Sequence, residues 1–119
     1  MKKFFLNDPI YGANWVVVFG GELHQAINLF CKKYKVPHTE SAKDTIGRYG
    51  HFFTYTPFKG GLIWFPDLRP SSGTIAHESL HAVHYMLSNC LEASLIDANE
   101  EIYAYYLQWL VQEIKDRSK

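Results

Sequence analysis

The pentapeptide His77-Glu78-Ser79-Leu80-His81 constrains the fold of this chain most, because its two histidines can act together only if the segment is helical. Residues four apart in a helix lie on one face, one turn from each other. A helix start is predicted at Ser71-Ser72-Gly73-Thr74, directly after Pro70. Four apolar residues recur at helical spacing and predict a face turned away from the histidines: Ile75, Leu80, Val83 and Leu87. The sequence therefore predicts an amphipathic helix with two imidazoles on one side.

This spacing is typical of a metal site. Two neutral imidazoles one turn apart can reach the same tetrahedral metal ion, and the carboxylate of Glu78 can touch a water molecule beside that ion. The alternative is a helix that carries His77 and His81 by coincidence. A catalytic zinc ion needs three protein ligands and an open position, so a third donor has to come from elsewhere in the chain.

Two adjacent acids compete for the place of third ligand. Glu100 and Glu101 open the last predicted helix, 19 and 20 residues beyond His81. Helical periodicity favours Glu100, which it places near an apolar stripe formed by Ala104, Leu107 and Val111. Glu101 falls instead on the side of Gln108 and Gln112. In the first turn of a helix, either acid can also serve as a cap.

The pattern HExxH, followed about twenty residues later by Glu-x-x-Ala on a second helix, resembles the gluzincin zinc peptidases. It is most similar to small single-domain forms, which include phage- and prophage-encoded metallopeptidases. In that family the ligand is the Glu three residues before a small residue, and Glu101-Ile102-Tyr103-Ala104 matches this rule. The resemblance covers residues 50–112. It implies a zincin-like fold and Zn²⁺ held by His77, His81 and Glu101, with Glu100 as the alternative ligand.

Two further positions bear on the site. Many family members carry Asp or Asn after the small residue to hold a ligating His, whereas this chain has Tyr105, whose hydroxyl has a different reach. A metzincin would need Gly and a third His where this chain has His84 and Leu87, so that family is set aside. We interpret His84 as a packed or hydrogen-bonded core residue, with a position beside the ligands or in the cleft as the alternative.

A chain of 119 residues is long enough for a single domain, and residues 1–119 are expected to form one. The predicted order is a strand over 14–19, a helix over 22–34, a β-hairpin over 51–65, the metal helix and a helix over 100–115. This order predicts an α+β fold, with a small, mostly antiparallel sheet on one side and helices on the other. The hairpin is expected to supply an edge strand that can hold an extended peptide.

Composition excludes several classes of partner. Lys plus Arg and Asp plus Glu each number 12, so we expect neither nucleic acid nor an acidic membrane as a partner. The apolar start at residues 1–6 is broken by Asn7-Asp8-Pro9, and no stretch is long enough to span a bilayer, so a cytoplasmic protein is expected. Cys31 and Cys90 lack metal or redox spacing and are expected to be reduced thiols without a role. The aromatic content of 16% predicts a dense core or a lined cleft.

The predicted function is zinc-dependent hydrolysis of peptide bonds, in which Glu78 takes a proton from water and passes it to the leaving amine. The substrate would be a peptide or protein, and no residue is singled out to stabilise the oxyanion. The alternative function is that of a metal-bound but non-catalytic binding or regulatory protein with the same fold, or of a metal-free structural module.

Overall fold

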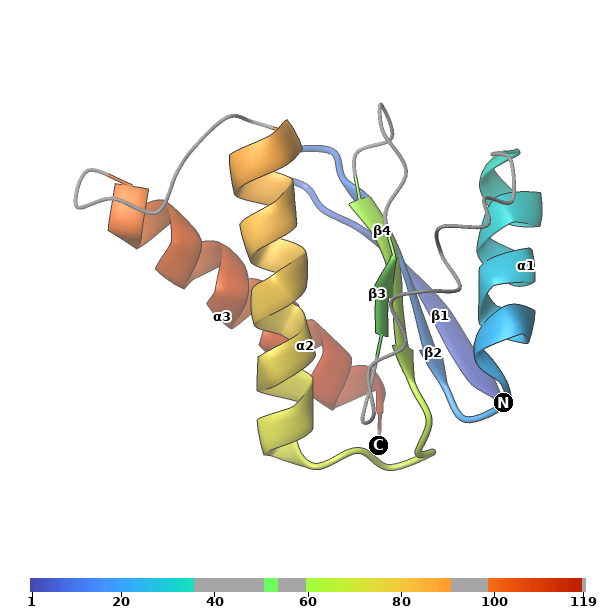
Figure 1. Ribbon diagram of the computed structural model, residues 1–119. Coiled ribbons are helices and arrows are strands. Elements are labelled where there is room, and N and C mark those ends of the chain that lie inside the picture. The colour runs from blue at the N-terminus through green and yellow to red at the C-terminus, as the bar shows by residue number, and fades with distance from the viewer. Residues whose placement is uncertain (36–50, 54–59, 91–98, 119) are drawn as a thin grey trace.

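The computed structural model describes residues 1–35, 51–53, 60–90 and 99–118, which form an α+β fold around one mixed sheet (Figure 1). The strands are β1 (Lys2–Asn7), β2 (Asn14–Phe19), β3 (His51–Phe53) and β4 (Gly60–Phe65). The helices are α1 (Leu23–Tyr34), α2 (Ser72–Tyr85) and α3 (Glu100–Arg117), and a π-helical turn, Met86–Cys90, continues α2. The predicted connector over 38–48, most of the hairpin loop and the Cys90 side chain lie outside the described residues.

The four strands lie in the order β1-β2-β4-β3. The outer pairs β1–β2 and β3–β4 are antiparallel, whereas the central pair β2–β4 is parallel, with Asn14 opposite Gly60 and Phe19 opposite Phe65. Helix α1 lies in the connection between β2 and β4, as a parallel pair requires a long crossover. The hairpin and its edge strand are thus confirmed, and β3 is the outer strand of the two.

Strand β1 is a feature that the sequence interpretation missed. Its residues alternate between the two faces of the sheet, so that Phe4 and Leu6 join the core while Lys3 and Phe5 are exposed. Asp8 then closes the connection to β2, because its Oδ1 accepts hydrogen bonds from the backbone N–H of Ile10 at 2.6 Å and Tyr11 at 3.1 Å. The apolar start of the sequence therefore lies in β1, the outer strand on this side of the described sheet.

Helices cover both faces of the sheet, so the expectation that they share one side is wrong. Strand β2 is apolar at successive positions, and its side chains alternate in direction. Trp15, Val17 and Phe19 pack with α2 and α3, whereas Val16 and Val18 pack with α1. A strand that is apolar on both faces has to be covered on both, and this requirement places α1 opposite the other two helices.

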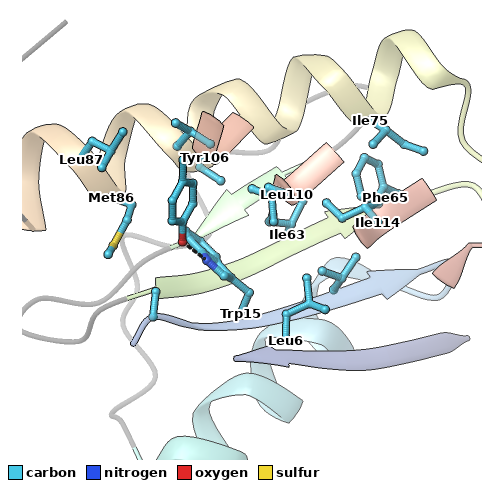
Figure 2. Packing of buried hydrophobic residues seen from close by; sticks show 14 of the residues in the cluster. Leu6, Trp15, Ile63, Phe65, Ile75, Met86, Leu87, Tyr106, Leu110 and Ile114 are labelled. Atoms are coloured by element: carbon cyan, nitrogen blue, oxygen red, sulfur yellow. Dashed lines mark hydrogen bonds between the residues drawn. The ribbon is translucent and has the colours of Figure 1, made fainter. Parts of the chain in front are cut away.

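The larger core lies between the sheet and helices α2 and α3, and it contains a polar contact (Figure 2). The indole N–H of Trp15 donates a hydrogen bond of 2.9 Å to the hydroxyl oxygen of Tyr106, which joins β2 to α3. Burial raises the pKa of the Tyr106 phenol, and the nearby Asp8 carboxylate raises it further, so the hydroxyl keeps its proton. The aromatic content predicts either a dense core or a lined cleft, and the fully buried side chains of Trp15, Phe19, Phe30, Phe65 and Tyr106 belong to a core.

The buried stripe of α3 differs from the one that periodicity predicts. Ala104 is exposed, and Leu107 and Val111 are only half-buried. The buried residues of this helix are Tyr103, Tyr106, Leu110 and Ile114. In α2, Leu80 is likewise 49% exposed rather than part of the apolar face. Ile75, Val83 and Leu87 of the predicted face of α2 are buried, so that prediction is wrong only at Leu80, whereas the buried stripe of α3 is rotated because contacts with the sheet and with α2 decide which side is covered.

Cys31 of α1 is buried, and burial raises the pKa of its thiol, which makes the reactive thiolate rarer. None of the helices in the described part of the chain combines the length and the apolar character needed to cross a bilayer.

Candidate metal site

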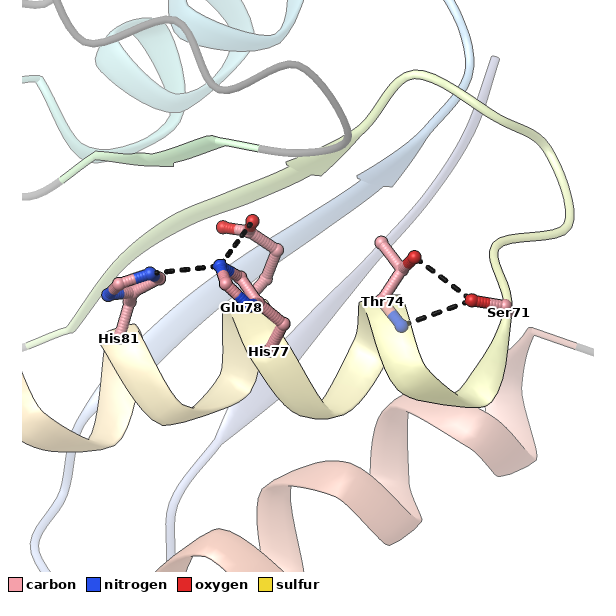
Figure 3. A network of polar contacts seen from close by, with 5 residues as sticks. All are labelled: Ser71, Thr74, His77, Glu78 and His81. Carbon is pink, nitrogen blue, oxygen red and sulfur yellow. Dashed lines mark hydrogen bonds and ion pairs between the residues drawn. The ribbon is translucent and has the colours of Figure 1, made fainter.

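The start of α2 is set by its N-cap, as the sequence predicts. The hydroxyl of Ser71 accepts a hydrogen bond of 3.1 Å from the backbone N–H of Thr74, and the two hydroxyl groups lie 2.9 Å apart. Such a cap satisfies one of the free N–H groups of the first turn. Helix α2 therefore begins at Ser72, and His77, Glu78 and His81 follow in its second and third turns on one side of the helix (Figure 3).

The structure brings the two imidazoles of the motif together. The Nε2 atoms of His77 and His81 lie 3.3 Å apart, and the ring planes are inclined at 73°. Without a metal ion, one ring nitrogen donates a hydrogen bond to the other. Two nitrogens bound to one tetrahedral zinc ion at about 2.0–2.1 Å each would be about 3.3–3.4 Å apart. Both residues are exposed, so solvent reaches the two rings.

Glu78 lies beside this pair in a different environment. Its carboxylate Oε1 is 4.0 Å from Nε2 of His77, while the residue as a whole is only 7% exposed. Burial raises the pKa of the Glu78 carboxyl, and positive charge on His81 and His77 partly offsets that rise. A carboxylate with a raised pKa is a better proton acceptor near neutral pH than an exposed one. The arrangement thus combines two exposed nitrogen donors with one partly desolvated base.

In the part of the chain that the structure describes, no third ligand joins this pair. Glu100 and Glu101 occupy the first turn of α3, and both side chains are exposed. Over the described residues, no three His, Cys, Asp or Glu side chains are grouped so that they could hold a metal ion. Helices α2 and α3 contact each other, but the segment 91–98 that joins them lies outside the described residues. His77, Glu78 and His81 are therefore assembled by α2 alone.

The two remaining candidates lie at the surface. His84 is exposed, and its ring centroid is 6.2 Å from that of Tyr103. Its interpretation as a packed core histidine is therefore wrong, because α2 turns Ala82 and Val83 toward the core and leaves position 84 outside. Tyr105 is 66% exposed on α3, and its proposed role in holding a ligating histidine stays a prediction.

Edge strand β3 lies next to the motif helix. Helix α2 contacts both β3 and β4, and β3 is the last strand of the sheet on that side. The backbone of an edge strand offers hydrogen-bonding groups that an extended peptide can use. The expectation that the hairpin supplies an edge strand is thus met, among the described residues, by residues 51–53, which contact α2.

Comparison with known proteins adds no further support. A scan against protein-family models finds no match, and searches of the curated proteins and of the solved structures find none either. The function therefore has to be argued from the chemistry of α2 and its surroundings.

Proposed function

We propose that this chain is a zinc-dependent peptidase whose HExxH helix holds Zn²⁺ through His77 and His81 and uses Glu78 as the general base. The observation that carries the proposal is the 3.3 Å separation of the two Nε2 atoms, which fits two ligands of one tetrahedral zinc ion. Zinc is the first choice for a site of imidazole and carboxylate ligands, although other divalent ions also accept such donors.

Each residue has a distinct part in the proposed reaction. Bound zinc would supply Lewis acidity, which makes water a better nucleophile and polarises the substrate carbonyl. Glu78 accepts the proton of the attacking water and later donates it to the leaving amine. Its position 4.0 Å from His77 keeps the carboxylate next to the ligand nitrogens without making it a ligand. Strand β3 would align the peptide by backbone hydrogen bonds, as edge strands do in other peptide complexes.

The third ligand in this proposal is Glu101, with Glu100 as the alternative, and this choice depends on the family resemblance. Glu101-Ile102-Tyr103-Ala104 matches the family rule, and Ala104 itself is exposed. Glu100 and Glu101 point in different directions because neighbouring residues of a helix are about 100° apart, and the burial of Tyr103 fixes the rotation of this turn. The zincin-like character of the fold is part of the same proposal.

Zinc binding tests the proposal directly. The unsubstituted protein should bind a single zinc ion. His77→Ala or His81→Ala should weaken binding by more than about 100-fold, because losing a residue that binds the metal costs more affinity than losing one that only holds such a residue in place. Competition with a chromophoric chelator measures the affinity, and elemental analysis after dialysis measures the stoichiometry. His84→Ala is the matched control, because it removes an exposed histidine one turn further along α2. Equal affinities for all three variants would contradict the proposed site.

The two acids of α3 can be separated in the same assay. Glu101→Ala should weaken zinc binding by at least about tenfold, whereas Glu100→Ala should leave it near that of the unsubstituted protein. Both side chains are exposed, so neither change removes core packing, and each variant is the control for the other. The reverse order would show that Glu100 is the ligand, and no effect of either would place the third ligand outside this helix turn.

A further inference from the structure

A second candidate site lies on the opposite side of the sheet from the histidines. Strand β1 forms one edge of the sheet, and helix α1 packs on the neighbouring strands β2 and β4. Between the edge strand and the helix is a groove of about 590 Å³, which falls within the size range of ligand pockets. We call it the β1/α1 groove; it is lined by Lys3, Phe5, Asn28, Leu29, Lys32 and Lys33.

The charge of the β1/α1 groove has one sign. Every charged residue that lines it is a lysine, although the chain as a whole has a formal net charge of zero. In the described part of the chain, no carboxylate pairs with the ammonium groups of Lys3, Lys32 or Lys33. A local concentration of positive charge in a groove attracts anionic groups, even on a neutral protein.

The floor of the groove is apolar and comes from the edge strand. Phe5 is 41% exposed, and the ammonium group of Lys33 lies 5.0 Å from the centre of its ring. This cation–π contact holds one lysine above the strand. Leu29 adds an aliphatic wall from α1. An occupant that fits therefore presents both acidic and apolar groups.

Strand β1 itself favours an extended chain as the occupant. Among the described residues its one neighbouring strand is β2, so backbone N–H and C=O groups along its outer side point away from the sheet. Six residues of edge strand are about 20 Å long and can pair with a peptide of similar length. In such a peptide every second side chain would lie on the α1 side of the sheet, where the lysines are.

We infer that the β1/α1 groove binds an acidic peptide segment, which adds to the sheet as a strand along β1 and directs its carboxylates toward Lys3, Lys32 and Lys33. Backbone pairing with β1 supplies the affinity common to all extended peptides. The lysines select for acidic side chains at alternate positions. Because α1 and α2 cover opposite faces of the sheet, this site is separate from the metal site and does not depend on zinc or on hydrolysis.

A peptide titration followed by NMR tests this inference. The probe is a peptide of alternating Glu and Val with as many residues as β1, which is six. Amide shifts should change in β1 and along the groove side of α1, and the lysine variant K3Q/K32Q/K33Q should bind at least about tenfold more weakly. The control variant R69Q/K115Q/R117Q removes the same charge from exposed residues outside the groove and should bind as the unsubstituted protein does.

Two further peptides separate strand pairing from simple charge attraction. Only alternate N–H groups of a paired strand face its neighbour, so N-methylation of one alternate set should abolish binding, whereas methylation of the other set should not. A peptide with the same residues in two blocks should bind more weakly than the alternating one. Equal binding of all these peptides, or equal effects of the two triple variants, would overturn the inference. So would tighter binding of oligothymidylate or of phosphatidylserine vesicles to the same residues.

Discussion

Replacing Glu78 with glutamine is expected to lower peptide hydrolysis by at least about 100-fold and to leave zinc affinity unchanged, because general acid–base catalysis typically contributes that much or more. Glutamine has nearly the same shape as glutamate but cannot accept the proton of the attacking water. Glu78 is 7% exposed and only 4.0 Å from His77, so a larger change would also disturb this proposed ligand. Glu78→Gln therefore removes the proton acceptor and keeps the shape of the site.

A pool of fluorescence-quenched peptides, supplied with zinc, provides the rate measurement. The matched control is Glu113→Gln, which changes a carboxylate on the far part of α3 that pairs with Arg117 instead of the histidines. Chelation should abolish cleavage, and added zinc should restore it. Undiminished cleavage by Glu78→Gln would contradict the role of Glu78. Zinc binding without cleavage of any peptide by the unsubstituted protein would instead support the non-catalytic binding or regulatory alternative.

Substitution of Gly60 by alanine is expected to destabilise the protein by about 3 kcal/mol or more, since it combines backbone strain with a backbone clash. Gly60 has a φ of 115° at the start of β4, opposite Asn14 in the central parallel pair. A Cβ atom there would lie 1.9 Å from the carbonyl oxygen and 2.7 Å from the carbonyl carbon of Asn14. Because these are backbone atoms of the neighbouring strand, no side-chain rotation relieves the contact.

Gly12→Ala is the matched control for this prediction. Gly12 also has a positive φ, of 73°, but a Cβ atom at that position would meet nothing within 4 Å. Its substitution should cost only the strain of the left-handed conformation, about 1–2 kcal/mol. Urea denaturation of both variants gives the two free energies of unfolding. Equal losses at Gly12 and Gly60 would show that the close approach of β4 to β2 is not what requires glycine at position 60.

Local sequence signals predict most of the elements that the structure contains. Neighbouring residues predict the helix start within residues 71–74, the strand Asn14–Phe19 and the helix that ends at Tyr34, and the structure confirms all three. Strand β1 was not predicted, because Asn7, Asp8 and Pro9 indicate a break in the chain but do not indicate that the residues before it form a strand. Its partner β2 and the burial of Leu6 are what make these residues a strand.

In the candidate site, too, local features are predicted from the sequence and features that depend on tertiary contacts are not. The contact between His77 and His81 depends on helical spacing alone, so the sequence predicts it correctly. The exposure of His84 and Leu80 could not be predicted, because periodicity gives the width of an apolar face but not the direction of the elements that cover it. The same limit applies to α3, where Tyr103 and Tyr106 are buried in place of the expected Ala104.

The spacing of two imidazoles and a carboxylate on α2 follows from the sequence alone, since one turn of helix is a local property of the backbone. The burial of Glu78 and the exposure of both histidines depend instead on how α2 packs on the sheet, which no local pattern specifies. The tertiary structure also places Lys3 of the first strand beside Lys32 and Lys33 of the first helix. These residues are distant in the chain, and the groove between them exists only because α1 covers β2 and β4 and leaves the edge strand β1 open.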